Sequence, residues 1–193
     1  MSSDTGDAIL HRFARDFYSY VVDYSVEICA NISTDNDFVL TDVVSGKDEQ
    51  YTQNSVVKTR QTCTLSRYSH YIFHSHPLQS RAYPSAEDIL KVLKNRHIII
   101  QSYISTSWGV WIISNTSTSN GYSDASRHSW LELLTKKTSD IGKHTPHDTR
   151  YPHIKSPPLN HQTRRYIQRK ISEIESATNL RIELREWSEI NKN

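Results

Sequence analysis

Two histidines and an aspartate have a spacing that suits a single metal ion. His74 and His76 follow an apolar run and are two residues apart, so on a strand their side chains point to the same side. Asp88, twelve positions after His76, falls in the first turn of a predicted helix, where the helix dipole favours a carboxylate. Two imidazoles and one carboxylate leave a fourth tetrahedral position for water, which is typical of catalytic zinc.

The residues around these candidate ligands resemble the signature of a known family. His74-Ser75-His76-Pro77, followed by Pro84-Ser85 and Asp88, is similar to the motif of the JAMM metalloproteases, also called MPN-plus or JAB domains. That signature includes a glutamate on an upstream strand, and Glu27 in Val26-Glu27-Ile28-Cys29-Ala30 matches it. Two departures are a longer loop from Pro77 to Pro84 and Ala30 in place of the usual glycine. A surface loop tolerates one added residue because closure entropy grows slowly with length.

The resemblance implies both a fold and a chemistry. The implied fold is α/β (α+β) of the MPN/JAB type, similar to cytidine deaminases, with a central mixed β-sheet flanked by helices over residues 8–115. The implied cofactor is Zn²⁺, bound by His74, His76 and Asp88, with Glu27 as general base and Ser85 assisting the tetrahedral intermediate. The implied function is hydrolysis of peptide or isopeptide bonds, with ubiquitin-like conjugates as protein substrates.

Other interpretations of the same residues stay open. Taken alone, Glu27 is a solvated strand residue, and Ser85 with Asp88 is a helix-capping pair. A non-enzymatic MPN domain that acts as a scaffold or assembly subunit, or as a structural protein of a virus, is the alternative function. A nucleobase deaminase has a related fold but needs His-x-Glu and Pro-Cys-x-x-Cys. Neither motif occurs in the sequence, which disfavours this class.

Composition narrows the class of protein. Among 193 residues, 23 Lys and Arg balance 21 Asp and Glu, so net charge does not indicate nucleic acid as a partner. The only cysteines, Cys29 and Cys63, argue against a disulfide framework and against a cysteine zinc finger, and suit a reducing compartment. No apolar run approaches the ~20 residues of a membrane helix, and no signal-peptide pattern is present. We therefore expect a soluble intracellular protein, in cytoplasm or nucleus, or in a virion if viral.

Periodicity predicts the elements that position the site. Residues 1–7 are polar and expected to be frayed, and 8–21 form an amphipathic helix. A hairpin of strands at 26–32 and 38–44 places Glu27 on the face opposite the aliphatic residues. Gly46 to Glu49 suggests a loop, and 55–65 favours another strand. Ser85 is the predicted N-cap of the helix that carries Asp88.

The second half is predicted to close the domain and continue into an extension. Strands at 98–104 and 108–113 form the hairpin that closes it, and 116–160 is a linker with a short helix at 126–136. Residues 161–193 form an extension, with a helix at 161–177 and a final strand. This helix carries four basic residues. We expect them to face solvent, and binding of an acidic partner is the less favoured alternative. They are Arg164, Arg165, Arg169 and Lys170. A second metal site is disfavoured at His144, His147 and His153, because no cysteine or acidic set accompanies them.

Overall fold

A mixed β-sheet with helices on both faces forms the body of the protein, in a computed structural model that describes residues 3–35, 38–53, 56–78, 80–116, 122–123, 126–143 and 159–190. In chain order the elements are α1 (Ser3–Val22), β1 (Ile28–Ser33), β2 (Val39–Ser45), β3 (Lys47–Gln53), β4 (Val56–Thr62), β5 (Tyr71–Ser75), α2 (Ala86–Lys94), β6 (Gln101–Thr106), β7 (Gly109–Asn115), α3 (Arg127–Lys143), α4 (His161–Thr178), β8 (Leu180–Glu186) and α5 (Trp187–Ile190). The predicted α/β class, a mixed sheet flanked by helices, is confirmed.

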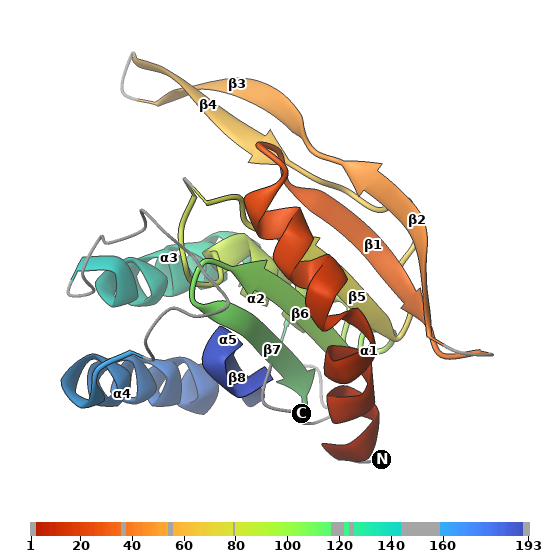
Figure 1. Ribbon diagram of the computed structural model, residues 1–193. Helices are drawn as coiled ribbons and strands as arrows, with labels where there is room; N and C mark the ends of the chain where they lie inside the picture. Colours follow the sequence, from red (N-terminus) through yellow and green to blue (C-terminus); the bar gives the residue numbers. More distant parts are fainter. Residues whose placement is uncertain are drawn as a thin grey trace.

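Six strands make up the main sheet, in the order β2-β1-β5-β6-β7-β8 (Figure 1). β5 and β6 run parallel and are connected through α2, whereas every other neighbouring pair is antiparallel. The predicted hairpins, β1 with β2 and β6 with β7, are both present. β5, which carries His74, lies inside the sheet between β1 and β6, so an interior strand positions the candidate site.

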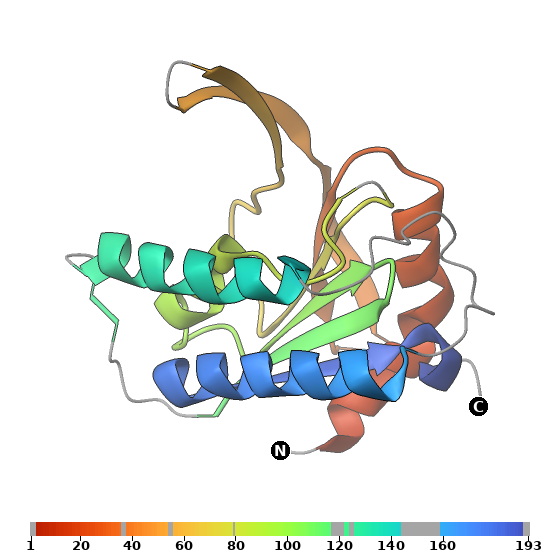
Figure 2. The ribbon, with the colours of Figure 1, turned by 90° about the vertical axis from the view of Figure 1, so that its left-hand side faces the viewer.

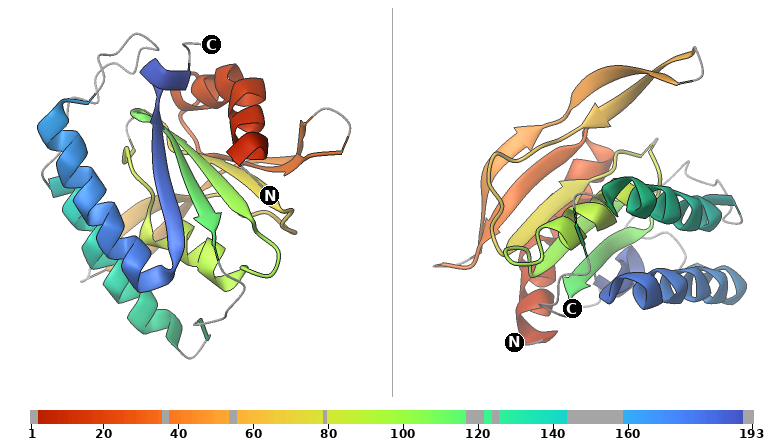
Figure 3. Two further views of the ribbon diagram at one scale, coloured as in Figure 1. Left: turned by 90° about the horizontal axis from the view of Figure 1, so that it is seen from below. Right: turned by 180° about the vertical axis from the view of Figure 1, so that it is seen from behind.

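The two faces of the sheet are covered by different helices (Figure 3). α1 packs on one face through residues that recur at three- and four-residue intervals, as predicted: Ile9, Leu10, Phe13, Phe17 and Val21. Phe17 stacks on Phe73 of β5, with ring centroids 4.3 Å apart. α2, α3 and α4 bury apolar residues on the opposite face, around Trp111. Because neighbouring strand residues point to opposite faces, His74 points to the side covered by α2, α3 and α4.

The first helix begins earlier than predicted. Residues 3–7, expected to be frayed, form the first turns of α1. The carboxylate of Asp7 lies 3.3 Å from the guanidinium of Arg185 on β8, and Gly6 lies against Gln101 of β6. These contacts join segments far apart in the chain, so local hydrophobic periodicity could not predict them.

β3 and β4 form a separate antiparallel ribbon that projects from the body (Figure 2). β4 confirms the strand predicted within 55–65. The prediction of a loop from Gly46 to Glu49 is wrong, because β3 begins at Lys47. Lys47, Asp48 and Gln50 are all exposed, so this strand lacks the alternation of buried and exposed residues by which a strand is predicted.

Several element boundaries also differ from prediction by one or more residues, and for two of them the contacts give the reason. β6 begins at Gln101 rather than Ile98, because the backbone N–H groups of Ile98 and Ile99 donate to the Asn95 carbonyl in the turn that ends α2. α3 continues to Lys143 instead of ending near 136, since Thr138 and Ile141 extend its buried face. A local turn overrides the apolar composition at Ile98, and burial against the core extends α3.

The C-terminal helix and strand belong to the same body as the main sheet. β8 pairs with β7 from Leu180 opposite Asn115 to Glu186 opposite Gly109, so the prediction that the β6–β7 hairpin closes the domain is wrong. α4 buries Ile167, Ile171 and Ile174 in the core on the α2 side. The histidines at 144, 147 and 153 lie outside the described residues.

The basic stretch on α4 is engaged within the protein. Arg164 forms an ion pair with the buried Glu186 and a second one with Glu189. Lys170 lies 3.1 Å from Glu173 and 3.7 Å from Asp140 on α3. Two of the four predicted basic residues therefore bind carboxylates of this chain.

Truncation of Ile174 tests whether the C-terminal segment unfolds with the rest of the protein. Ile174 is 1% exposed, so Ile174→Ala should lower the free energy of unfolding by about 2–5 kcal/mol, and Ile174→Val by about 0.5–1.5 kcal/mol. Denaturant unfolding, followed by circular dichroism and tryptophan fluorescence, should show one shifted transition. A separate early transition that leaves the main transition unmoved would contradict a single cooperative body.

Candidate metal centre

The two histidines lie at one end of β5. His74 pairs with Cys29 on β1 and with Ile104 on β6. His76 follows the strand, and its backbone N–H donates to the Ser105 carbonyl at 2.8 Å. Both residues are buried, with 7% and 2% exposed, and their ring centroids are 5.0 Å apart. The pair is thus held rigidly by the sheet, with the two imidazoles adjacent.

Glu27 reaches the histidines from the residue just before β1. Its Oε2 lies 3.2 Å from Nε2 of His74. Its backbone is fixed on both sides, because its carbonyl accepts from Gly46 N–H at 2.6 Å and the next N–H, of Ile28, donates to Ser75 Oγ at 2.9 Å. Ser75, the residue between the two histidines, therefore joins β5 to the first residue of β1, directly after Glu27.

Removal of the Ser75 hydroxyl should loosen this junction. Ser75→Ala leaves the buried Ile28 N–H without its partner, which should cost about 1–3 kcal/mol of unfolding free energy. Ser176→Ala removes an exposed hydroxyl on α4 that donates to Ser172, and should change stability by less than about 0.5 kcal/mol. Urea unfolding of both variants measures the difference, and equal effects would contradict the role given to Ser75.

Asp88 and Ser85 form a capping box at the start of α2. Ser85 Oγ accepts from the Asp88 backbone N–H at 3.1 Å and donates to Asp88 Oδ2 at 2.6 Å, and Ser85 N–H donates to the same oxygen at 2.8 Å. Ser85 is the N-cap, as predicted. The Asp88 carboxylate also lies 3.1 Å from His74 Nδ1 and 3.3 Å from His76 Nε2. The start of α2 thus presents one carboxylate to both imidazoles.

His74 and Asp88 each shift the pKa of the other. Burial alone would lower the pKa of His74, but the neighbouring Asp88 carboxylate, helped by Glu27, outweighs burial and raises it. The pKa of Asp88 behaves in the opposite sense: burial would raise it, but the two histidines hold it well below its usual range. The charged Asp88–His74 pair is therefore favoured. Because a metal binds neutral imidazole, metal binding here would release the His74 proton.

The donor set fits a metal ion. Glu27, His74 and His76 each offer a ligand atom, and these atoms all lie within 4.8 Å of one another. Both ring nitrogens of His74 are buried without the alignment of a hydrogen bond, although carboxylate oxygens lie 3.1 and 3.2 Å away. Imidazole and carboxylate are ordinary zinc ligands, and buried nitrogens without aligned partners suit a metal. The four predicted metal and base residues thus lie together, but the tight group contains Glu27, the predicted base, in place of Asp88, the predicted ligand: Glu27 faces Nε2 of His74 and Asp88 faces Nδ1.

One outer contact selects the ligand atom of His76. Its Nδ1 lies 3.0 Å from the carbonyl oxygen of Arg81, which can only accept a hydrogen bond. Nδ1 therefore carries the proton, and Nε2 of the neutral ring keeps its lone pair for a metal. The next carbonyl, of Ala82, accepts from the buried Trp111 Nε1 at 2.9 Å, which fixes the loop. Sequence reasoning missed Arg81 in this role, because a backbone carbonyl leaves no signal in residue types.

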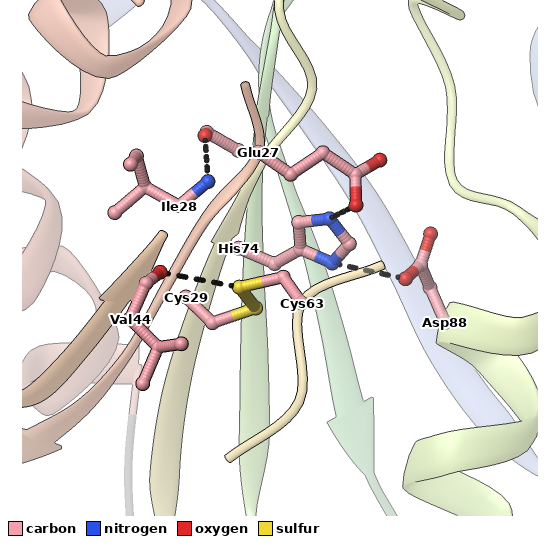
Figure 4. The surroundings of a disulfide bond; sticks show 8 residues. Glu27, Ile28, Cys29, Val44, Cys63, His74 and Asp88 are labelled. Atoms are coloured by element: carbon pink, nitrogen blue, oxygen red, sulfur yellow. Dashed lines mark hydrogen bonds and ion pairs between the residues drawn. A yellow bond between two sulfur atoms is a disulfide. The ribbon is translucent and has the colours of Figure 1, made fainter. Parts of the chain in front are cut away.

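A disulfide lies beside the site (Figure 4). Cys29 and Cys63 are joined, with Cα atoms 5.8 Å apart, and Cys29 is the cross-strand neighbour of His74. The argument against a disulfide, drawn from the small number of cysteines, is therefore wrong, since two cysteines 34 positions apart give no sequence signal of their proximity. The pairing also removes the argument that linked the small cysteine count to a reducing compartment. The link fastens the segment after β4 to β1, next to the metal-ligand candidates.

Comparison with known proteins gives no assignment: no family model, no curated protein and no solved structure matches the chain. Within the described residues, no helix is both long and apolar enough to span a bilayer. Fold and site together define a mixed α/β protein with a buried histidine–carboxylate cluster at the end of an interior strand.

Proposed function

We propose that this chain is a zinc-dependent hydrolase of peptide or isopeptide bonds with an MPN/JAB-type fold. One observation carries the proposal: the buried His74 ring lies between Glu27 and Asp88 at 3.2 and 3.1 Å, with His76 beside it. A purely structural histidine needs one good partner, whereas each nitrogen of this buried ring faces a carboxylate. The resemblance to the JAMM signature supplies the ligand assignment.

In this proposal His74, His76 and Asp88 hold the ion. Bound zinc would supply Lewis acidity, which polarises a scissile carbonyl and makes hydroxide available near neutral pH. The outer contacts support the ligand geometry: the Arg81 carbonyl orients His76, and Ser85 N–H and Oγ orient Asp88 Oδ2. Such outer contacts usually account for 10–100-fold in metal affinity, so the ligands here are well supported.

Glu27 is the proposed general base. Its side chain is 14% exposed, against 9% for His74, 5% for Asp88 and 2% for His76, so it is the member of the cluster most open to water and substrate. Its carboxylate takes a proton from the attacking water and passes it to the leaving nitrogen. The peptide group between Glu27 and Ile28 is held by Gly46 N–H and by Ser75 Oγ, which fixes the backbone from which the Glu27 side chain extends.

Ser85 is the proposed stabiliser of the developing oxyanion. Its hydroxyl proton donates to Asp88 Oδ2. To serve a substrate, it must rotate away from this bond while the Ser85 backbone N–H continues to hold the carboxylate. An oxyanion donor of this kind contributes about 10²–10³ in rate.

The proposed substrates are proteins joined to ubiquitin-like modifiers, following the family resemblance. The test is hydrolysis of a panel of linear and lysine-linked ubiquitin-like conjugates by the purified chain, with added zinc and after chelation. Cleavage that requires zinc supports the proposal. Intact conjugates after incubation with a folded, zinc-loaded chain would count against it.

A scaffold or assembly subunit with the same fold is the alternative. The observation that favours it is the closed capping box, in which Ser85 and Asp88 already satisfy each other without a ligand. Such a protein would keep the cluster as an ion-paired structural element. Zinc content separates the two functions, because the scaffold does not need the ion.

A further inference from the structure

A cavity of about 430 Å³ lies beside the candidate metal centre, between the loop that follows His76 and helix α3. One wall is the 80–83 loop with Ala86 at the start of α2, and the other is a face of α3. Its lining residues are Ser80, Arg81, Tyr83, Ala86, Thr135, Thr138 and Ser139. The volume is within the range of small-ligand sites, so a side chain or small molecule fits.

The lining has a single chemical character. It contains one cation, Arg81, and five hydroxyl groups, and it contains no carboxylate. Two hydroxyls are used inside α3, because Thr138 donates to the Thr135 carbonyl at 3.4 Å and Ser139 to the Lys136 carbonyl at 2.9 Å. Among the described residues, no partner is found for the side chains of Arg81, Ser80, Tyr83 or Thr135. Arg81 and three hydroxyl-bearing residues therefore line one space without a partner in the described part of the chain, and Arg81 and Thr135 are exposed to solvent.

Tyr83 packs tightly against helix α3 at Gly142. Gly142 on α3 has no side chain at the place where Tyr83 packs, and a Cβ there would overlap the Tyr83 hydroxyl. The acidic residue that follows Ser139, Asp140, lies 3.7 Å from Lys170 on α4 and so has a cation of its own. The cavity thus keeps its positive and donor-rich character.

We propose that this cavity is a binding site for an oxyanion group, a carboxylate or a phosphate, carried by a side chain or small molecule. A guanidinium binds both anions through paired N–H donors, and hydroxyl groups complete their coordination. The cavity is larger than a bare ion needs, which favours an anion attached to a larger group. If the proposed hydrolase function holds, an acidic or phosphorylated substrate residue beside the scissile bond would occupy it.

The cavity is also connected to the metal centre. The same Arg81 whose side chain lines the cavity accepts a hydrogen bond from His76 Nδ1 through its carbonyl oxygen. An anion that draws in the Arg81 side chain acts on the residue that orients a candidate metal ligand. Because of this link, we expect substrates that carry such an anion to be favoured at the metal centre.

Binding is tested on the full chain without metal, so the result does not depend on hydrolysis. Inorganic phosphate, phosphoserine and glutamate are titrated into ¹⁵N-labelled chelator-treated protein, and the amide shifts of residues 80–83, 85–86 and 135–139 are followed. We expect saturable shifts confined to these residues. Arg81→Gln should weaken binding by about tenfold, and Tyr83→Phe by a smaller factor, because a charge-assisted contact is stronger than a neutral one.

The control is Arg181→Gln, which removes a 70% exposed arginine on the edge strand β8 and should leave binding unchanged. Tighter binding of phosphoserine than of glutamate assigns the site to phosphate, and the reverse assigns it to carboxylate. Absence of saturable shifts with all three probes, or equal weakening by Arg81→Gln and Arg181→Gln, would overturn the proposal. A failed hydrolysis assay leaves this result untouched, so the two proposals are tested separately.

Discussion

Glu27→Gln is expected to reduce hydrolysis by about 10²–10⁴-fold while the protein keeps its fold and its zinc. Glutamine has the same shape, so the two hydrogen bonds of the peptide group between residues 27 and 28 remain. It has no basic oxygen to take the proton from water. Initial rates of conjugate cleavage, measured beside zinc content, separate loss of chemistry from loss of metal.

The metal content of this variant also decides which carboxylate is the third ligand. The resemblance assigns Asp88, whereas the atoms of Glu27, His74 and His76 form the tight group in the structure. We expect Asp88→Asn to lose zinc and Glu27→Gln to retain it. Glu87→Gln, which alters an exposed carboxylate on the first turn of α2, should change neither rate nor zinc content. Zinc loss in Glu27→Gln with retention in Asp88→Asn would reverse the two roles.

His74→Ala should have the largest effect on metal binding. His74 belongs to either ligand set and is the residue that contacts both carboxylates. Its removal should weaken zinc affinity by more than the ~100-fold upper end seen for loss of an outer-shell partner. Competition with a chromophoric chelator measures the affinity, and circular dichroism confirms folding.

The matched control is His70→Ala, four positions earlier. His70 is exposed, and its Nδ1 contacts the Ile98 carbonyl rather than the cluster. Its replacement should leave zinc affinity unchanged. If both variants bind zinc as tightly as the wild type, the ion is held elsewhere or only at the surface.

The candidate site was predictable because its chemistry is carried by residue types at fixed spacings. His74 and His76 are brought together by strand geometry, and Asp88 by the N-cap at Ser85, so each relation is local. Glu27 is distant in sequence, and only the resemblance connected it to the histidines. Two features of the site could not be predicted from the sequence. The Arg81 contact uses a backbone carbonyl, which any residue has, and the disulfide of Cys29 with Cys63 depends on the proximity of residues far apart in the chain.

The fold was predictable where one face is buried and periodic. α1 and the β6–β7 hairpin follow their apolar patterns. β3 did not, because its described side chains are exposed and carry no alternation. The place of β8 at the edge of the main sheet depends on pairing with β7, and no local pattern specifies a partner strand.

Zinc content of the purified wild-type chain tests the central claim most directly. Elemental analysis after dialysis, with folding confirmed by circular dichroism, should give one zinc per chain, and chelation should remove it. That result would establish the cluster of His74, His76, Asp88 and Glu27 as a metal centre once the variants above lose or keep the ion as expected. A folded wild-type chain that takes up no zinc would contradict the hydrolase proposal and favour the scaffold alternative.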